Sequence, residues 1–273
     1  MGSTVERLLV RTWNLFHGNT KPPGRAAFLE EMVRLVTADE PDVVCLQEVP
    51  VWALGRLGQW SGMTTVGDVA ARPRLGPLLE VEKTVTDLHH GLLRSAVTGQ
   101  ANAMLVSSTL AVVEHRRLVL NPFRFRRAQA HRLGLPLIAR LGWARERRVC
   151  QSVRIRRGDG TFVVGNMHAT SYRSDRRIAD AELLRAAVFV DGMALPDEPV
   201  LLSGDFNLTV RSSRTLAELM TDEWGFSGAT PTGIDHVLVR GFRAGQPYAW
   251  PTERRLRGGH LFSDHTPVER EVE

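Results

Sequence analysis

The sequence Ser203-Gly204-Asp205-Phe206-Asn207-Leu208 follows an apolar run at residues 199–202 and ends it abruptly. The run is typical of a buried β-strand. If the backbone stays extended beyond it, Asp205 and Asn207 point to the same side, because side chains alternate along a strand. A carboxylate and a carboxamide would then share one small volume. The alternative interpretation is a plain turn at the end of the strand, since Gly, Asp and Asn all favour turns.

Polar residues also mark the ends of the other apolar runs. Strands are predicted at residues 8–14, 41–48, 103–106, 149–156, 161–166 and 233–239, with a last strand from residue 268. The polar residues at or beside the strand ends are Asn14, Glu48, His168, Asp205, Asn207, Asp235, Asp264 and His265. Eight such residues in six segments are hard to explain as unrelated turns. They predict one site that is assembled from several strand ends.

Amphipathic helices are expected between the strands. Apolar residues recur at helical spacing at residues 25–38, 78–93 and 174–191, and shorter helices are predicted at 51–60 and 212–220. A helix between two buried strands indicates a βαβ-like unit or a layered α/β sandwich. No linker, repeat or low-complexity block divides the chain, so one domain over residues 1–273 is predicted.

The composition is that of an ordinary globular protein. Apolar residues make up 43% of the 273 residues and charged residues 24%, as expected for a packed core and a solvated surface. The first residues lack the apolar core of a signal peptide, and no segment has the apolar length of a membrane span. Cys45 and Cys150 show no metal-ligand spacing and are expected to be reduced thiols. These features predict a cytoplasmic protein.

The formal net charge is +5, and residues 115–148 are the most basic part of the chain. Arginine suits phosphate groups because its planar guanidinium can donate two parallel hydrogen bonds. Three interpretations of this segment compete: a solvated helical excursion over the core, a nucleic-acid contact, and a contact with an anionic membrane. The first is favoured, and the membrane ranks third because Pro136 and Gly142 interrupt a long amphipathic helix. The candidate substrate-binding residues here are Arg124, Arg126 and Arg127.

The order and local sequence of the strand ends resemble those of the endonuclease/exonuclease/phosphatase superfamily of metal-dependent phosphoesterases. The matching motifs are Trp13-Asn14, Leu46-Gln47-Glu48, Asn166-Met167-His168, Gly204-Asp205-Phe206-Asn207, Ile234-Asp235-His236 and Ser263-Asp264-His265. Each motif is short, but all six occur in order over nearly the whole chain. The resemblance implies a four-layer α/β sandwich, in which two packed mixed β-sheets are flanked by helices and the site lies at one end.

The resemblance also implies a metal site. The position of Glu48 holds Mg²⁺, with Mn²⁺ as a substitute, and the positions of Asn14 and Asp264 support the metal. Oxygen ligands suit Mg²⁺, which binds through few carboxylates together with the substrate phosphate. The lack of cysteine or multi-histidine spacing argues separately against zinc.

The remaining matched residues are implied to carry the chemistry. Asp205 would orient or deprotonate the attacking water, and Asn207 would hold this water or a phosphate oxygen. His265, polarised by Asp235, would bring positive charge or a proton donor to the phosphate, since a neighbouring carboxylate raises a histidine's pKa. His168 would make a second contact with the phosphoryl group. The sequence leaves open which histidine acts as acid or base.

These features predict a Mg²⁺-dependent hydrolase of phosphodiester bonds, with nucleic acid as the favoured substrate of an endonuclease or exonuclease. The abasic-site repair branch of the superfamily usually has tyrosine at the position of His168, so that specialised role is not expected. A second hypothesis is a phosphodiesterase or phosphatase that acts on phospholipid headgroups or small phosphoesters. A third is a catalytically silent module that binds phosphate or nucleic acid.

Overall fold

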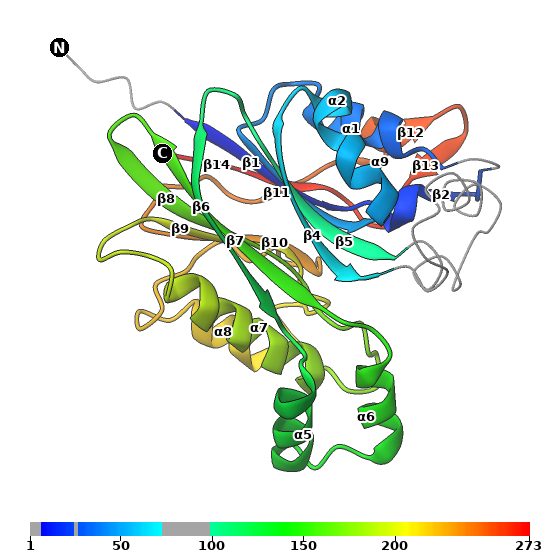
Figure 1. Ribbon diagram of the computed structural model, residues 1–273, viewed down its shortest axis with the longest axis vertical. Coiled ribbons are helices and arrows are strands. Elements are labelled where there is room, and N and C mark those ends of the chain that lie inside the picture. Colours follow the sequence, from blue (N-terminus) through cyan, green and yellow to red (C-terminus); the bar gives the residue numbers. More distant parts are fainter. Residues whose placement is uncertain (1–6, 25–26, 73–98) are drawn as a thin grey trace.

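The computed structural model describes residues 7–24, 27–72 and 99–273, and its centre is a pair of mixed β-sheets (Figure 1). The six strands of the first sheet are, in spatial order, β11 (Tyr248–Ala249), β14 (Val268–Val272), β1 (Leu8–Asn14), β3 (Val43–Val49), β5 (Gln100–Val106) and β4 (Thr64–Ala71). The five strands of the second sheet are β10 (Asp235–Arg240), β9 (Val200–Asp205), β8 (Gly160–His168), β7 (Val149–Arg157) and β6 (Ala111–Val119). A small third sheet contains β12 (Leu256–Arg257), β13 (His260–Phe262) and β2 (Thr20–Lys21).

Helices cover the outer faces of the two large sheets. In Figure 1, α1 (Leu29–Thr37) and α2 (Leu57–Ser61) lie over the first sheet, and α7 (Arg177–Asp191) and α8 (Arg214–Leu219) lie over the second. Short helical turns are η1 (Phe16–Gly18), η2 (Val51–Arg56) and α9 (Thr252–Arg255). The predicted sandwich of two mixed sheets flanked by helices is confirmed.

The strands that carry the predicted site are central strands with helices or strands on both faces. Every residue of β9 is buried, as are nearly all residues of β1 and β3. Double burial explains why these segments read as continuous apolar runs rather than as alternating ones. A core cluster between the sheets includes Val10, Val43, Val164, Leu201 and Val237.

A buried polar link joins the two sheets. Gln47 Nε2 on β3 donates to Asn166 Oδ1 on β8 at 2.8 Å. Asn166 Nδ2 in turn lies 3.0 Å from the carbonyl oxygen of Ala103 and 3.1 Å from Gln151 Oε1. Unpaired polar groups would be costly between two apolar layers, so this network fixes how the sheets face each other.

A helical hairpin projects from the second sheet between β6 and β7. It contains α5 (Phe123–Arg132) and α6 (Leu137–Ala144) and forms the lower end of the molecule in Figure 1. Pro136 precedes the first turn of α6, where a missing N–H costs nothing. The basic segment at 115–148 therefore contains strand as well as helix.

Several sequence predictions need correction. The helix expected from residue 25 begins at Leu29, and strands β4 and β6 were not expected. The helix expected at 78–93 lies outside the described residues. Within the described ranges, no helix combines the length and the hydropathy that crossing a bilayer requires.

Candidate functional site

Strand pairing brings three of the predicted site residues into one row. His168 on β8 is the register partner of Asp205 on β9 in the parallel pair, and Asp235 on β10 is the partner of Asp205 in the antiparallel pair. His265 follows β13 and joins them, so that one ligand atom each of Asp205, Asp235 and His265 lies within 4.8 Å of the others. The residues lie at the end of the sandwich where β8 and β9 terminate.

Asp205 is a buried carboxylate at the centre of this cluster. Its Oδ2 accepts from Asn14 Nδ2 at 3.0 Å and lies 3.3 Å from His168 Nε2, and its Oδ1 accepts from the backbone N–H of Asn207 at 2.9 Å. Burial, together with the charge of Asp235, raises the pKa of Asp205 to about 7. A carboxylate with such a pKa can exchange a proton near neutral pH.

Gly204 allows this close approach of β8 and β9. Its φ is +137°, and a Cβ atom there would lie 1.9 Å from the carbonyl oxygen of Met167. No side chain fits, because a real Cβ does not approach backbone so closely. The glycine before Asp205 is therefore a packing requirement.

His265 and Asp235 form a charged pair. His265 Nδ1 lies 2.8 Å from Asp235 Oδ2, and its Nε2 lies 3.8 Å from Asp205 Oδ2. Burial alone would lower the pKa of His265, but the carboxylates of Asp235, Asp205 and Asp264 raise it to about 10. The ring is therefore an imidazolium at neutral pH.

Hydrogen bonds from distant elements hold the loop that carries His265. Trp13 Nε1 and Arg255 Nη1 donate to the carbonyl oxygen of His265 at 3.0 and 2.9 Å. Ser263 Oγ donates to the carbonyl oxygen of Asn14 at 2.6 Å and accepts from the backbone N–H of His265 at 3.1 Å. These bonds fix the imidazolium relative to β1.

His168 differs from His265 in charge. It is buried, and burial together with the charge of Arg148 lowers its pKa well below the usual value. Gln100 Nε2 and Arg148 Nη1, both donors, lie 3.0 and 2.9 Å from its Nδ1. Arg148 Nη1 also lies 3.1 Å from Nε2, which faces Asp205 Oδ2 at 3.3 Å.

Glu48 reaches the cluster from the first sheet because of an irregularity in β3. The pairing of β3 with β5 shifts register between Leu46 and Val49, and Glu48 has a φ of +54°. Bulges and left-handed residues occur often at functional sites, where they re-aim a side chain. Glu48 Oε1 lies 3.8 Å from His168 Nε2, and Oε2 lies 3.5 Å from His17 Nε2.

The residues present fit a hard divalent cation. Glu48 and Asp264 keep 20% and 29% of their side chains exposed at the edge of the cluster, and Asp264 lies 3.8 Å from Lys21 Nζ. Asp235 Oδ1 is buried and has no hydrogen-bond partner among the residues that the structure describes. A set of carboxylate oxygens suits Mg²⁺. His265 is a poor metal ligand in its charged form, because both ring nitrogens of an imidazolium carry hydrogen.

The structure groups the predicted residues differently from the sequence. The predicted metal set was Asn14, Glu48 and Asp264. Among the His, Cys, Asp and Glu residues that the structure describes, Asp205, Asp235 and His265 have ligand atoms within 4.8 Å of one another. The sequence-based roles of all eight residues therefore remain predictions.

Of the two interpretations of Asn207, the turn is confirmed and the extended backbone is not. Strand β9 ends at Asp205, Asn207 has a φ of +53°, and its Nδ2 donates to the carbonyl oxygen of Ala169 at 3.0 Å. The two residues meet through the Asn207 backbone N–H rather than through strand alternation. A turn with a carboxylate as acceptor is a common use of Asp.

Three further residues belong to the site. His17, which belongs to none of the six motifs, is buried near Glu48. Gln100 belongs to none of the six motifs, and Arg148 is one of many arginines in the basic segment at 115–148. Their contacts with Glu48 or His168 depend on tertiary packing, which local sequence does not signal.

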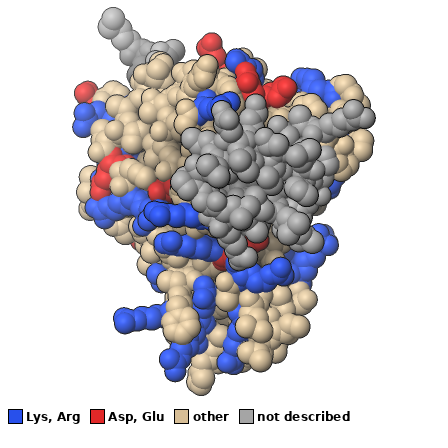
Figure 2. All heavy atoms as spheres, turned by 45° about the vertical axis from the view of Figure 1, so that its right-hand side comes forward, with Lys and Arg blue, Asp and Glu red and all other residues tan. Residues whose placement is uncertain are grey.

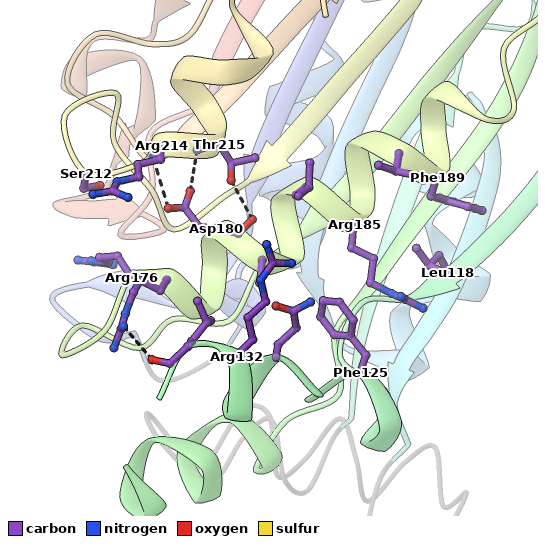
Figure 3. A pocket seen from close by; sticks show the side chains of 16 residues that line it. Leu118, Phe125, Arg132, Arg176, Asp180, Arg185, Phe189, Ser212, Arg214 and Thr215 are labelled. Carbon is purple, nitrogen blue, oxygen red and sulfur yellow. Dashed lines mark hydrogen bonds between the residues drawn. The ribbon is translucent and has the colours of Figure 1, made fainter. Parts of the chain in front are cut away.

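Beside the site lies an arginine-lined hollow of about 1020 Å³ (Figure 3). Arg176 connects the two, because its Nη1 donates to the carbonyl oxygen of Asn207 at 2.9 Å. Apolar side chains of Phe125 and Phe189 line it together with the arginines, and Arg185 lies over the Phe125 ring at 4.6 Å. Arg124, Arg126 and Arg127, the predicted substrate contacts, lie apart on α5.

Comparisons with known proteins agree with this geometry. The model of the Endonuclease/Exonuclease/phosphatase family matches residues 12–265. An endonuclease/exonuclease/phosphatase from Bacteroides vulgatus has a similar fold, with a TM-score of 0.68, 15% identity, and coverage of 98% of this chain and 99% of that one. A functionally unknown conserved protein from Enterococcus faecalis V583 gives 0.67 and 15%, with coverage of 97% and 99%.

TDP2 from Caenorhabditis elegans gives a TM-score of 0.62 at 17% identity, and the match covers 98% of this chain and 74% of that one. No curated protein sequence matches significantly. At these identities the solved structures show the shared fold alone. The family model covers nearly the whole chain, including every motif from β1 to His265, and the chain therefore belongs to the Endonuclease/Exonuclease/phosphatase family.

Proposed function

We propose that this protein hydrolyses phosphodiester bonds with the help of a divalent cation, and that nucleic acid is its substrate. Members of its family are metal-dependent phosphoesterases. The observation that carries the proposal is the cluster of a carboxylate with a pKa of about 7, Asp205, beside a charged histidine, His265. A base and a fixed cation within one site match the needs of water attack on a phosphate.

Each side chain has a role in this proposal. Asp205 accepts a proton from the attacking water, and the Asn207 backbone N–H holds Asp205 in place. His265, charged through Asp235, stabilises the negative charge that develops on the phosphoryl oxygens. The neutral His168, whose Nε2 lies 3.3 Å from Asp205 Oδ2, makes a second contact with the phosphoryl group.

When bound, Mg²⁺ supplies Lewis-acid stabilisation of a phosphoryl oxygen. Glu48 is the proposed principal ligand, with Asn14 and Asp264 in support. Asn14 reaches Asp205 through its Nδ2, so it also ties the proposed metal side of the site to the base.

A polymeric anion suits the surface beside the cluster. The hollow next to Asn207 is lined by several arginines, among them Arg132, Arg176 and Arg214. Arginines at such a place can hold phosphates that flank the scissile one. A lipid-headgroup phosphodiester is a second candidate, favoured by the exposed apolar residues of the α5–α6 hairpin.

The test is a turnover assay on plasmid DNA, single-stranded DNA, RNA, phospholipid vesicles and small phosphoesters, with Mg²⁺ or with EDTA. His265→Ala is compared with His260→Ala, which changes a peripheral histidine that contacts Thr20 and Pro22. We expect nucleic-acid cleavage that requires Mg²⁺ and His265 but tolerates the His260 change. Cleavage that persists in EDTA or in His265→Ala would refute the proposed chemistry, and turnover of phospholipid alone would move the substrate to the second candidate.

A further inference from the structure

The charged residues of the α5–α6 hairpin are all basic. Residues 115–145 contain no Asp or Glu, although the whole chain has 30 acidic and 35 basic residues. The arginines of this stretch are Arg116, Arg117, Arg124, Arg126, Arg127, Arg132, Arg140 and Arg145. In Figure 2 the lower end of the molecule shows blue and tan surface, whereas red patches lie higher up. The hairpin therefore carries positive charge and no carboxylate of its own.

The same hairpin exposes large apolar side chains. The exposed fractions are 73% for Ile138, 71% for Leu137, 67% for Phe123 and 60% for Leu141, the highest among the large hydrophobic residues of the described chain. Leu137 and Leu141 are four residues apart and Ile138 and Leu141 are three apart, so their side chains lie on one side of α6. We call these three exposed residues of α6, together with the exposed Phe123 at the start of α5, the apolar tip.

The hairpin has a packed core of its own, so the apolar tip is not simply a poorly packed inner face. The inner face of α6 packs Ala139 and Trp143 against Ala130 and Ile178. Trp143 Nε1 also donates to the buried Glu182 on α7 at 2.6 Å. The hairpin is thus anchored by one face, and the apolar tip belongs to the other.

We propose that the hairpin attaches the protein to anionic lipid membranes. The apolar tip enters the interface between headgroups and acyl chains, and arginines beside it, such as Arg124 and Arg127, pair with lipid phosphates. Charge complementarity identifies the lipid as anionic. This attachment goes beyond the proposed hydrolysis and does not depend on it.

Pro136 and Gly142, which interrupt a long amphipathic helix in the sequence, are compatible with a membrane contact. Pro136 caps the start of α6, and Gly142 lies where a Cβ would meet the ring of Tyr172 at 2.8 Å. Both residues shape a short helix pair that keeps its apolar tip outward. A nucleic-acid contact explains the arginines but not the aliphatic tip, because Leu and Ile offer neither hydrogen bonds nor stacking to bases.

Vesicle co-sedimentation of the full chain, in EDTA, tests the attachment. Vesicles of phosphatidylcholine alone are compared with vesicles that also contain phosphatidylserine, over a range of salt concentrations. We expect binding to the anionic vesicles that weakens with salt. The combined variant Leu137→Ser, Ile138→Ser, Leu141→Ser should bind at least about tenfold more weakly, because it removes the buried apolar contact.

Leu195→Ser is the matched control, since Leu195 is 58% exposed outside the hairpin. It should bind like the wild type, and circular dichroism should show that both variants are folded. Failure of the wild type to bind anionic vesicles, or wild-type binding by the triple variant, would overturn the proposal. If duplex DNA binds instead and Arg124→Gln, Arg127→Gln abolishes that binding, the hairpin is a nucleic-acid contact.

Discussion

Replacing Asp235 by asparagine should discharge His265. In the wild type the pKa of His265 rises from 6.5 to about 10, despite burial, chiefly because Asp235 lies 2.8 Å away. At about 1.4 kcal/mol per pH unit, the site favours the imidazolium by roughly 5 kcal/mol. Asp235→Asn keeps the size of the side chain but removes its charge. Burial, which lowers the pKa of His265, is then opposed only by the more distant carboxylates, so we expect this pKa to fall by at least about two pH units.

NMR titration of the imidazole carbons measures this change in metal-free protein, with His265→Gln to assign the resonance. Asp264→Asn is the control, because Asp264 makes the smallest contribution among the three carboxylates that raise the pKa. A pKa that stays near 10 in Asp235→Asn, or that falls equally in the control, would refute the argument that this pair sets the charge.

The same pair makes stability depend on pH. The folded pKa of His265 lies above its unfolded value, so its stabilisation is complete below about pH 6.5 and is lost as pH rises to about 10. Thermal unfolding of the metal-free wild type should therefore show a Tm that declines over this window. In Asp235→Asn the decline should be smaller. An equal decline in both proteins would place its cause elsewhere.

Three other changes test the site. Asp205→Asn should lower turnover by roughly two orders of magnitude or more, because it removes the base. The same change should raise the Tm of the metal-free protein at pH 8, since the raised pKa of Asp205 means that its ionisation destabilises the folded state. A lower Tm would contradict this argument. Gly204→Ala should prevent folding or lower the Tm sharply, since its Cβ would lie 1.9 Å from the carbonyl oxygen of Met167, and a Tm within a few degrees of wild type would refute the fit. Glu48→Gln should raise the Mg²⁺ concentration needed for half-maximal turnover, and an unchanged requirement would remove Glu48 from the metal site.

Much of the fold could be predicted from local sequence. The central strands β1, β3 and β9 appear as apolar runs because both of their faces are buried. By contrast, β6 was missed because it has exposed and half-buried residues along its length, including arginines. Its pairing with β7 overrides the weak local pattern.

The site residues, too, could be predicted only in part from local sequence. Asp205 and His168 could be found as polar ends of apolar runs, but the environment of each could not. Arg148 lies 20 positions from His168 in the chain and lowers its pKa only because β7 and β8 pair. The two histidines differ in charge because of their packing, His168 being neutral and His265 positive, although each simply lies at the end or start of an apolar run in the sequence.

The sequence by itself determined which apolar segments form strands and which polar residues stand at their ends, since hydrophobic periodicity is a property of short stretches. Only the tertiary structure decided that Asp205 stands opposite Asp235, that His265 is held by Trp13, and that Asn207 leaves the extended conformation. Those outcomes depend on strand register and on contacts across as many as 252 positions. The charge of each group follows from its neighbours in space, because Coulomb interactions and desolvation act through distance and not along the chain.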